Sequence, residues 1–321
     1  MYKIKQIPED FIVKEIFSPM IDDGKYAYYV LKKRSYNTID AIKHIAASLD
    51  IPMKFINFAG TKDRNAVTEQ YISISMGPRK DLSWKDIELR YLGNGKERIN
   101  LGSHDGNHFE ITVRSLEDRK INVPRAVPNY FGRQRFGEGG GNVEIGRLLL
   151  KKQFKEALIL IDGNVSSNPI KELKLIPKQL LRLYIHAFQS DIWNKAVSKM
   201  LMRSIGKEKD GLWFPEVDID DETLPLLGFD DTMEGPDDFM AESEKLLLMY
   251  DITRRDFIIR QIPELSSDGD MRKLLIDVKD LSISDPEPDE LNPGKYKIKA
   301  CFFLPKGCYA TILITALFSA D

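Results

Sequence analysis

Asp63 is the residue in this chain whose surroundings best suit covalent or acid–base chemistry. It lies between two cations in the run Lys62-Asp63-Arg64. A carboxylate held in a fixed position can act as a nucleophile or accept a proton. The same run also suits a solvated turn with surface ion pairs, so these three residues alone leave both interpretations open.

The segments on either side of Asp63 predict the scaffold that would hold it. A short apolar run over 55–58 indicates a buried strand, and Ala59-Gly60 breaks it because glycine permits a sharp turn. Residues 71–75 then alternate apolar and polar side chains, which is typical of a half-buried strand. Asp63 is therefore expected on a loop between two strands, where catalytic groups often lie.

Residue patterns elsewhere predict further elements. Asn37 suits the N-cap of a helix over 39–49. Residues 285–290 read as a polar linker. The remaining expected elements are strands over 26–33, 109–114, 274–278, 295–303 and 309–314, a helix over 143–160, and a segment over 82–91 that is helical at its start and extended at its end. The last two strands are expected to form a hairpin that completes the sheet begun in the first half.

A second stretch combines aromatic and basic side chains. It runs Val127-Pro128-Asn129-Tyr130-Phe131-Gly132-Arg133-Gln134-Arg135-Phe136-Gly137. Aromatic rings can stack on bases while guanidinium groups meet phosphates, so this composition suits RNA. A packed loop with two exposed arginines is the alternative. The glycine-rich run over 137–141 lacks the Gly-Lys-Ser/Thr ending of a P-loop, which argues against nucleotide hydrolysis.

The net charge of −2 conceals an uneven distribution. Residues 210–290 hold 24 acidic and 7 basic residues, a net of −17, so the rest of the chain carries +15. A near-neutral total therefore does not exclude a polyanionic partner.

The sequence has no long apolar run and no signal-like start, which favours a cytoplasmic protein without membrane contact. It also has no long apolar seam, which favours a monomer, and His104 and His108 flank an expected turn, so no metal site is expected.

Several of these motifs resemble those of the TruD family of tRNA pseudouridine synthases. The loop sequence Gly-Thr-Lys-Asp-Arg-Asn-Ala-Val-Thr-Glu-Gln resembles the family's active-site motif, and 127–137 resembles its Pro-Asn-Tyr-Phe-Gly signature. The opening Pro-Glu-Asp-Phe-Ile-Val-Lys-Glu and the closing Phe-Leu-Pro-Lys-Gly-Cys-Tyr-Ala-Thr also resemble family segments. The similarity extends over nearly the whole chain and is weakest over 195–265.

The resemblance implies a role for each matched position. Asp63 would be the catalytic nucleophile, and Lys5 or Lys62 would keep it ionised. Asn129 would supply hydrogen bonds in the active site, and the ring of Phe131 would pack on the target uracil. Further candidates for contact with RNA are Arg64, Arg133, Arg135 and Arg272.

The resemblance also implies an α+β pseudouridine synthase fold with a mixed, mainly antiparallel sheet flanked by helices. Residues 1–154 and 290–321 would form the catalytic domain, and 155–289 an inserted α/β TRUD domain. The expected reaction converts uridine to pseudouridine in tRNA, at uridine 13, without a metal, cofactor or nucleotide. The strongly acidic insertion departs from the best-known family sequences, and would cap the active site or repel non-substrate nucleic acid.

Two other functions fit parts of the sequence. A non-catalytic RNA-binding or RNA-folding protein would use the same basic and aromatic residues and would not need Asp63. A hydrolase with two carboxylates would pair Asp63 with Glu69, but six residues and the start of a strand separate them. The intact Lys62-Asp63 motif favours the pseudouridine synthase.

Overall fold

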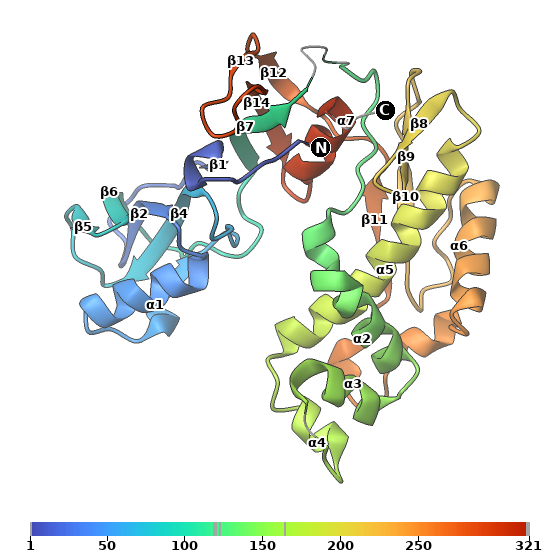
Figure 1. Ribbon diagram of the computed structural model, residues 1–321. Coiled ribbons are helices and arrows are strands. Elements are labelled where there is room, and N and C mark those ends of the chain that lie inside the picture. Colours follow the sequence, from blue (N-terminus) through green and yellow to red (C-terminus); the bar gives the residue numbers. More distant parts are fainter. Residues whose placement is uncertain (1, 118–120, 122, 164, 319–321) are drawn as a thin grey trace. The chain divides into compact units, whose positions relative to one another are not determined.

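The computed structural model describes residues 2–117, 121, 123–163 and 165–318, and the chain divides into two compact units (Figure 1). The first unit contains Met1–Ile121 and Asp277–Ala310, and the second contains Asn122–Ile276 and Thr311–Ser319. The chain thus passes from the first unit to the second after residue 121, returns to the first at residue 277, and enters the second again at residue 311. The boundaries of these units differ from the domain boundaries expected from the sequence. The inserted TRUD domain over 155–289 stays a prediction.

The first unit is organised around one mixed sheet of ten described strands. The main path has the order β12-β14-β7-β1-β4-β2-β6-β5, while β13 pairs with β14 and β3 pairs with β4. β1 and β4 run parallel, and the other pairings among the described strands of this sheet are antiparallel. The strands are β1 (Phe11–Ile16), β2 (Tyr26–Arg34), β3 (Ile56–Phe58), β4 (Val67–Ser75), β5 (Leu82–Trp84), β6 (Ile87–Gly95), β7 (Gly106–Leu116), β12 (Lys279–Ile283), β13 (Glu287–Pro288) and β14 (Tyr296–Pro305).

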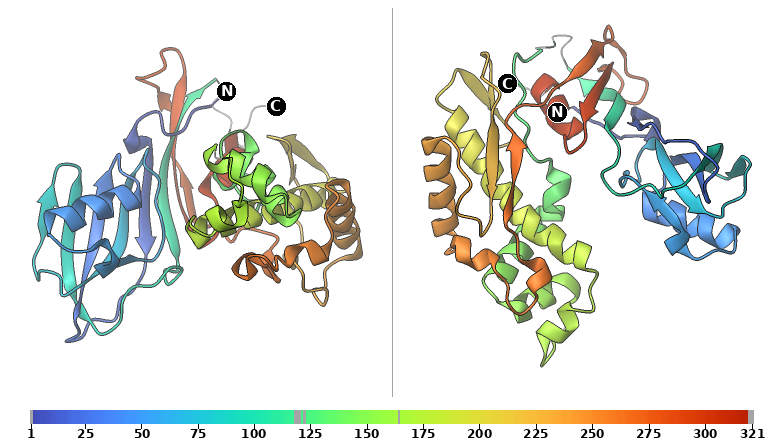
Figure 2. Two further views of the ribbon diagram at one scale, coloured as in Figure 1. Left: turned by 90° about the horizontal axis from the view of Figure 1, so that it is seen from below. Right: turned by 180° about the vertical axis from the view of Figure 1, so that it is seen from behind.

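Helix α1 (Thr38–Ser48) covers one face of this sheet (Figures 1 and 2). Its start is the predicted one, because the side chain of Asn37 accepts a hydrogen bond from the backbone N–H of Asp40 at 2.7 Å. Its apolar stripe packs on the strands in a single buried cluster, which includes Ala41, Ile42 and Ile45. Burial of this stripe, rather than helix propensity, stabilises a helix of this length.

The second unit is built around the long helix α5 (Lys178–Leu201), which lies between α2 and α6 (Figure 2). Large side chains on several sides of α5 are buried, among them Phe188 and Trp193. A helix buried in this way forms the centre of a unit rather than its surface. The other elements of this unit are α2 (Gly141–Leu150), α3 (Phe154–Asp162), α4 (Pro169–Leu173), α6 (Asp237–Met249), α7 (Ala310–Phe318), β8 (Gly206–Lys209), β9 (Leu212–Pro215), β10 (Thr223–Leu227) and β11 (Gly269–Lys273).

The predicted α+β class with a large mixed sheet is confirmed, and β14 completes the sheet by pairing with β7, as expected. The expected final strand over 309–314 is wrong, because residues 310–314 lie in α7 and form no closing hairpin. The run is apolar on all sides, with Ile312, Leu313 and Ile314 all buried. A short apolar run of this kind fits a buried helix as well as a strand, and its periodicity cannot separate the two.

Three other local predictions were wrong in part, and the extended end expected for 82–91 is confirmed by β6. The segment over 82–91 is a β5–β6 hairpin, and Asp86 in its turn has a φ of 62°. The helix over 143–160 is two helices, because Lys152 has a φ of 59° and breaks the chain between α2 and α3. The strand expected over 274–278 lies earlier, as β11, where it pairs with β10.

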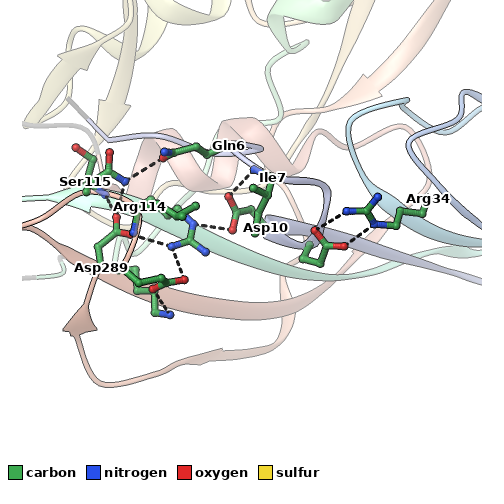
Figure 3. A network of polar contacts seen from close by, with 12 residues as sticks. Gln6, Ile7, Asp10, Arg34, Arg114, Ser115 and Asp289 are labelled. Atoms are coloured by element: carbon green, nitrogen blue, oxygen red, sulfur yellow. Dashed lines mark hydrogen bonds and ion pairs between the residues drawn. The ribbon is translucent and has the colours of Figure 1, made fainter. Parts of the chain in front are cut away.

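A buried ionic network joins distant parts of the first unit (Figure 3). Arg114 Nε donates to Asp10 Oδ1 at 2.7 Å, and its Nη1 donates to Asp289 Oδ1 at 2.8 Å. The side chains of Arg114, Asp10 and Asp289 are 4%, 1% and 0% exposed, so the expected polar linker over 285–290 holds a buried anchor instead. Buried charges of this kind are tolerated only when they are paired and hydrogen-bonded.

The network lowers the pKa of Asp289. Burial alone would raise the pKa, but hydrogen bonds from Ser115 N, Asn292, Leu291 N and Arg114 outweigh it and lower the pKa to about 2. Because the folded-state pKa lies below the unfolded one, this stabilisation is present above about pH 4 and is lost as the pH falls towards 2.

We therefore expect Asp289→Asn to lower the free energy of unfolding by about 3 kcal/mol at pH 7, because it leaves Arg114 partly unpaired. The deficit should shrink between pH 4 and pH 2, which urea titrations over this range would measure. Glu290→Gln is the matched control, since Glu290 also pairs with Arg114 but its side chain is 55% exposed. If both variants lowered the free energy of unfolding equally at pH 7, burial of the Asp289 carboxylate would not be what makes its pairing with Arg114 stabilising.

Candidate active site

The loop that carries Asp63 connects β3 to β4, two antiparallel neighbours in the first unit. This confirms the predicted placement between two strands. Lys5 Nζ donates to Asp63 Oδ2 at 2.5 Å, and the two side chains are 18% and 41% exposed. Asp63 thus combines a close cationic partner with access to solvent, which a carboxylate needs if it is to meet a substrate.

Lys62 makes a different ion pair from the one expected. Its Nζ lies 2.5 Å from Glu15 Oε2, with exposed fractions of only 8% for Lys62 and 0% for Glu15. Glu15 also accepts a hydrogen bond from the backbone N–H of Tyr71 at 3.0 Å. Of the two lysines expected to keep Asp63 ionised, Lys5 forms the direct contact, and Lys62 fastens the loop to the sheet beneath.

Three polar side chains fix the backbone of the Asp63 loop. The buried ammonium of Lys33 donates to the carbonyl oxygen of Asp63 at 3.0 Å and to that of Tyr36 at 2.5 Å. Thr38 Oγ1 accepts from the backbone N–H of Lys62 at 2.8 Å. Gln70 Nε2 donates to the carbonyl oxygen of Gly60 at 3.0 Å. The loop is therefore held by side chains from β2, α1 and β4.

Lys5, the partner of Asp63, is fixed by contacts of the N-terminal segment to which it belongs. It has a φ of 59°, in the left-handed region that costs a non-glycine residue about 1 kcal/mol or more. Its ammonium also lies 4.1 Å from the centre of the Phe11 ring. On one side of Lys5 the backbone of Lys3 pairs with that of Arg114, and on the other Asp10 is bound by the Arg114 side chain. The strained residue is thus anchored on both sides.

Two further residues from the sequence analysis lie near this loop without joining Asp63. Arg64 pairs with Asp40 Oδ2 at 2.5 Å and has a side chain that is 62% exposed, which leaves it accessible to a ligand. Glu69 lies in β4 with Lys14 and Lys32 as its register partners. Because the neighbours of Glu69 on both adjacent strands are lysines, the geometry does not favour a site that pairs it with a second carboxylate.

In the second unit, three of the predicted residues form one cluster. Arg272 donates through Nε to the carbonyl oxygen of Asn129 at 2.8 Å and through Nη2 to Asn129 Oδ1 at 2.7 Å. The same guanidinium lies 3.8 Å from the centre of the Phe131 ring. Asn194 fixes the backbone of Phe131 by accepting from its N–H and donating to its carbonyl, both at 2.9 Å. Arginine and aromatic planes stacked in this way provide a surface suited to bases.

The two remaining arginines of this motif point in different directions. Arg135 lies 5.7 Å from the centre of the Phe131 ring, and its Nε donates to Ser190 Oγ at 3.4 Å. Arg133 is 82% exposed and lies 3.0 Å from Asp210. The alternative of a packed loop with two exposed arginines is therefore correct for Arg133 and not for Arg135.

Glu15 and Lys33 are site residues that were not predicted from the sequence, although the strand pattern contains a signal for both. Glu15 shares the buried face of β1 with Phe11 and Val13, and Lys33 follows Leu31 on the buried face of β2. A charged residue at a buried position of an alternating strand needs a partner. That signal marks the position but does not reveal which distant residue is the partner.

Within the described part of the chain, no helix is long and apolar enough to cross a membrane. The described residues also contain no group of three or more His, Cys, Asp or Glu side chains placed to hold a metal ion.

Comparison with known proteins places this geometry in a family. The model of the family described as tRNA pseudouridine synthase D matches residues 2–172 and 221–317. The chain is 30% identical to the probable tRNA pseudouridine synthase D 2 of Methanocaldococcus jannaschii, over 98% of this chain and 91% of that protein. It is also 30% identical to the tRNA pseudouridine synthase D of Aquifex aeolicus, over 99% of this chain and 98% of that protein.

A solved structure agrees with this result. The crystal structure of the putative tRNA pseudouridine synthase D from Methanosarcina mazei superimposes with a TM-score of 0.71 at 25% identity, covering 99% of this chain and 93% of that one. The fold and the sequence matches together define an isomerase of the pseudouridine synthase class. The chain belongs to the tRNA pseudouridine synthase D (TruD) family.

The lowered pKa of Lys33, which anchors the Asp63 loop, leads to a testable dependence of stability on pH. Burial lowers the pKa of its ammonium to about 8, while the charge of Asp63 opposes this shift and that of Lys62 adds to it. Since the unfolded lysine titrates near 10.4, the unfolded state binds more protons between these two values. The free energy of unfolding should therefore rise with pH across this window, by up to about 1.4 kcal/mol per pH unit.

Lys33→Met should remove this rise, and Lys32→Met, an exposed neighbour on the same strand, should retain it. Urea titrations from pH 7 to pH 10 on the three proteins would measure the difference. Parallel curves for wild type and Lys33→Met would show that the buried ammonium does not titrate in this range.

Proposed function

We propose that this protein converts uridine to pseudouridine in tRNA, with uridine 13 as the target and Asp63 as the nucleophile. The observation that carries the proposal is the Lys5–Asp63 ion pair on a loop whose backbone is fixed by Lys33, Thr38 and Gln70. Preorganised charge of this kind is what a covalent or acid–base step requires. Membership of the tRNA pseudouridine synthase D family supports the choice of reaction and substrate.

The reaction needs little besides a positioned carboxylate. The bond from uracil N1 to ribose C1′ breaks, the base turns, and a bond from C5 to C1′ forms. The proton on C5 leaves and N1 gains one, so the composition of the nucleotide does not change. Asp63 would act by adding to the nucleotide while Lys5 holds one carboxylate oxygen in place.

The second unit would supply contacts to the base and to the RNA backbone. Extruding the target base from its stack costs a few kcal/mol, so the enzyme must offer a surface that replaces the lost stacking. The Phe131 ring, with the guanidinium of Arg272 over it, suits that purpose. Asn129, whose side-chain oxygen accepts a hydrogen bond from Arg272, would orient the base through hydrogen bonds. Arg64, Arg133 and Arg135 are proposed as contacts to RNA phosphates.

A non-catalytic RNA-binding protein is the second candidate, since the arginines would serve it equally well. The geometry around Asp63 favours the enzyme. A carboxylate repels phosphate, yet the backbone of this loop is fixed by a buried lysine and a buried ion pair, and its carboxylate meets Lys5, a residue held in the left-handed region.

Asp63→Asn tests the proposal directly, because it keeps the size of the side chain and removes its charge. We expect the variant to bind tRNA as wild type does, and its rate of pseudouridine formation to fall by at least about 1,000-fold. The measurements are pseudouridine mapping on a uridine-labelled tRNA transcript and RNA binding at fixed salt. The mapped position identifies the target uridine.

Asp86→Asn is the matched control, since it makes the same change in a surface turn of the same unit. It should leave both activity and binding unchanged. Full activity of Asp63→Asn would exclude Asp63 as the nucleophile. Binding of tRNA without any modification by wild type would favour the non-catalytic alternative.

A further inference from the structure

His104 lies beside the ion pair that fastens the Asp63 loop to the sheet. Gly60 is near the start of that loop, and a Cβ atom at this glycine would lie close to three side chains. The distances would be 3.4 Å to His104 Cε1, 3.6 Å to Lys62 Nζ and 3.9 Å to Glu15 Oε2. An imidazole, an ammonium and a carboxylate thus surround one point of the backbone, and all of them belong to the first unit.

The Nδ1 atom of His104 is buried and has no hydrogen-bond partner among the described residues. A protonated imidazole carries an N–H at both ring nitrogens, whereas the neutral ring carries only one. Protonation would therefore place a charged donor at a buried position without an acceptor, and an unpaired donor of this kind costs free energy. The position favours the neutral ring.

The charges that face His104 balance when the imidazole is neutral. Two carboxylates are near it, Glu15 from β1 and Asp105 from the turn before β7. Two ammonium groups are also near it, Lys62 from the Asp63 loop and Lys306 from the turn after β14. Burial lowers the pKa of His104, the charge of Glu15 opposes this shift, and the charges of the two lysines add to it. A proton on His104 would leave the cluster with one uncompensated positive charge.

Glu15 has no oxygen left for a second cation. Its side chain is fully buried, and Oε2 accepts from Lys62 Nζ at 2.5 Å while Oε1 accepts from the backbone N–H of Tyr71 at 3.0 Å. Buried charges are tolerated when they are paired, so a protonated His104 would compete with Lys62 for this carboxylate.

We propose that His104 is a positioning residue for the reaction and must be neutral for the Asp63 loop to keep its reactive geometry. Protonation would draw Glu15 away from Lys62, the residue next to Asp63, and Lys62 would lose its side-chain anchor on the sheet. A misplacement of about 1 Å lowers a rate by about 100-fold. The enzyme would then lose activity in acid and regain it when the pH is raised. The inference rests on the proposed function, because it concerns how Asp63 is held.

The test compares wild type, His104→Gln and His108→Gln in the full-length protein. Glutamine stays neutral at every pH and keeps a hydrogen-bonding group in place of the imidazole. His108 is the matched control, since it lies four residues further along the chain and is the register partner of Lys14. Its side chain therefore leaves the sheet on the face opposite to that of Glu15.

The pH dependence of the reaction is the main measurement. Single-turnover rates of pseudouridine formation at saturating enzyme would be measured from about pH 5 to pH 8, with tRNA binding at each pH. We expect the wild-type rate to fall about tenfold per pH unit below a midpoint that is lower than 6.5. His104→Gln should match wild type at pH 8 and keep its rate in acid, and His108→Gln should follow wild type. Binding of tRNA should vary alike in all three proteins, because the cluster acts on Asp63 and not on affinity.

Stability provides a second readout that does not depend on catalysis. Because the folded-state pKa of His104 lies below the unfolded one, the unfolded state binds more protons. The free energy of unfolding should therefore fall as the pH falls below about 6.5. Urea titrations should show a smaller fall for His104→Gln than for wild type, and an unchanged fall for His108→Gln.

The outcomes separate this inference from the function on which it rests. If His104→Gln loses activity in acid as wild type does, or if wild type loses none, His104 does not position the loop. An inactive Asp63→Asn would then leave the proposed function standing. A folded His104→Gln that is inactive at pH 8 would also overturn the inference, because a neutral side chain would not suffice. Should thermal unfolding show that this variant is not folded, His104→Asn takes its place. If wild type forms no pseudouridine at any pH, both proposals fail.

Discussion

The buried guanidinium of Arg114 is the constraint on which the geometry around Asp63 depends. It binds Asp10 near the start of the chain and Asp289 after the chain has returned from the second unit, and its backbone pairs with that of Lys3. The strained Lys5 lies between the two points that Arg114 holds. A left-handed lysine persists only where its surroundings fix it, so the ion pair with Asp63 is a product of this network rather than of the loop alone.

Local patterns were enough to predict the loop, the strands beside it, the capped start of α1 and the return of β14 to the sheet. These features depend on residues close in sequence, whose alternation or spacing already contains the information. The partners of buried charges could not be predicted in the same way. Lys62 is next to Asp63 in sequence and yet pairs with Glu15, because loop direction and strand register decide which groups meet. The final helix was missed because its run is almost entirely apolar and therefore has no polar face to reveal its period.

The two units hold their predicted site residues by different physical means. In the first, a charged carboxylate stands on a loop held by hydrogen bonds from buried side chains. In the second, the predicted residues form a stacked cluster in which Arg272 binds Asn129 and covers the ring of Phe131. The sequence indicated each member of this cluster separately. Their contact depends on β11, whose position was predicted five residues too late, so their arrangement could not be inferred.

The return of the chain to the first unit also sets an order of events during synthesis. Asp289 and β14 follow the whole of the second unit, and α7, which belongs mainly to that unit, comes after them. A ribosome therefore releases Lys5 and Asp63 long before Asp289, which completes the network around Arg114. A chain that ends before Asp289 would contain Lys5 and Asp63 but lack the second carboxylate that binds Arg114, so the segment around Lys5 would be held less firmly than in the complete protein.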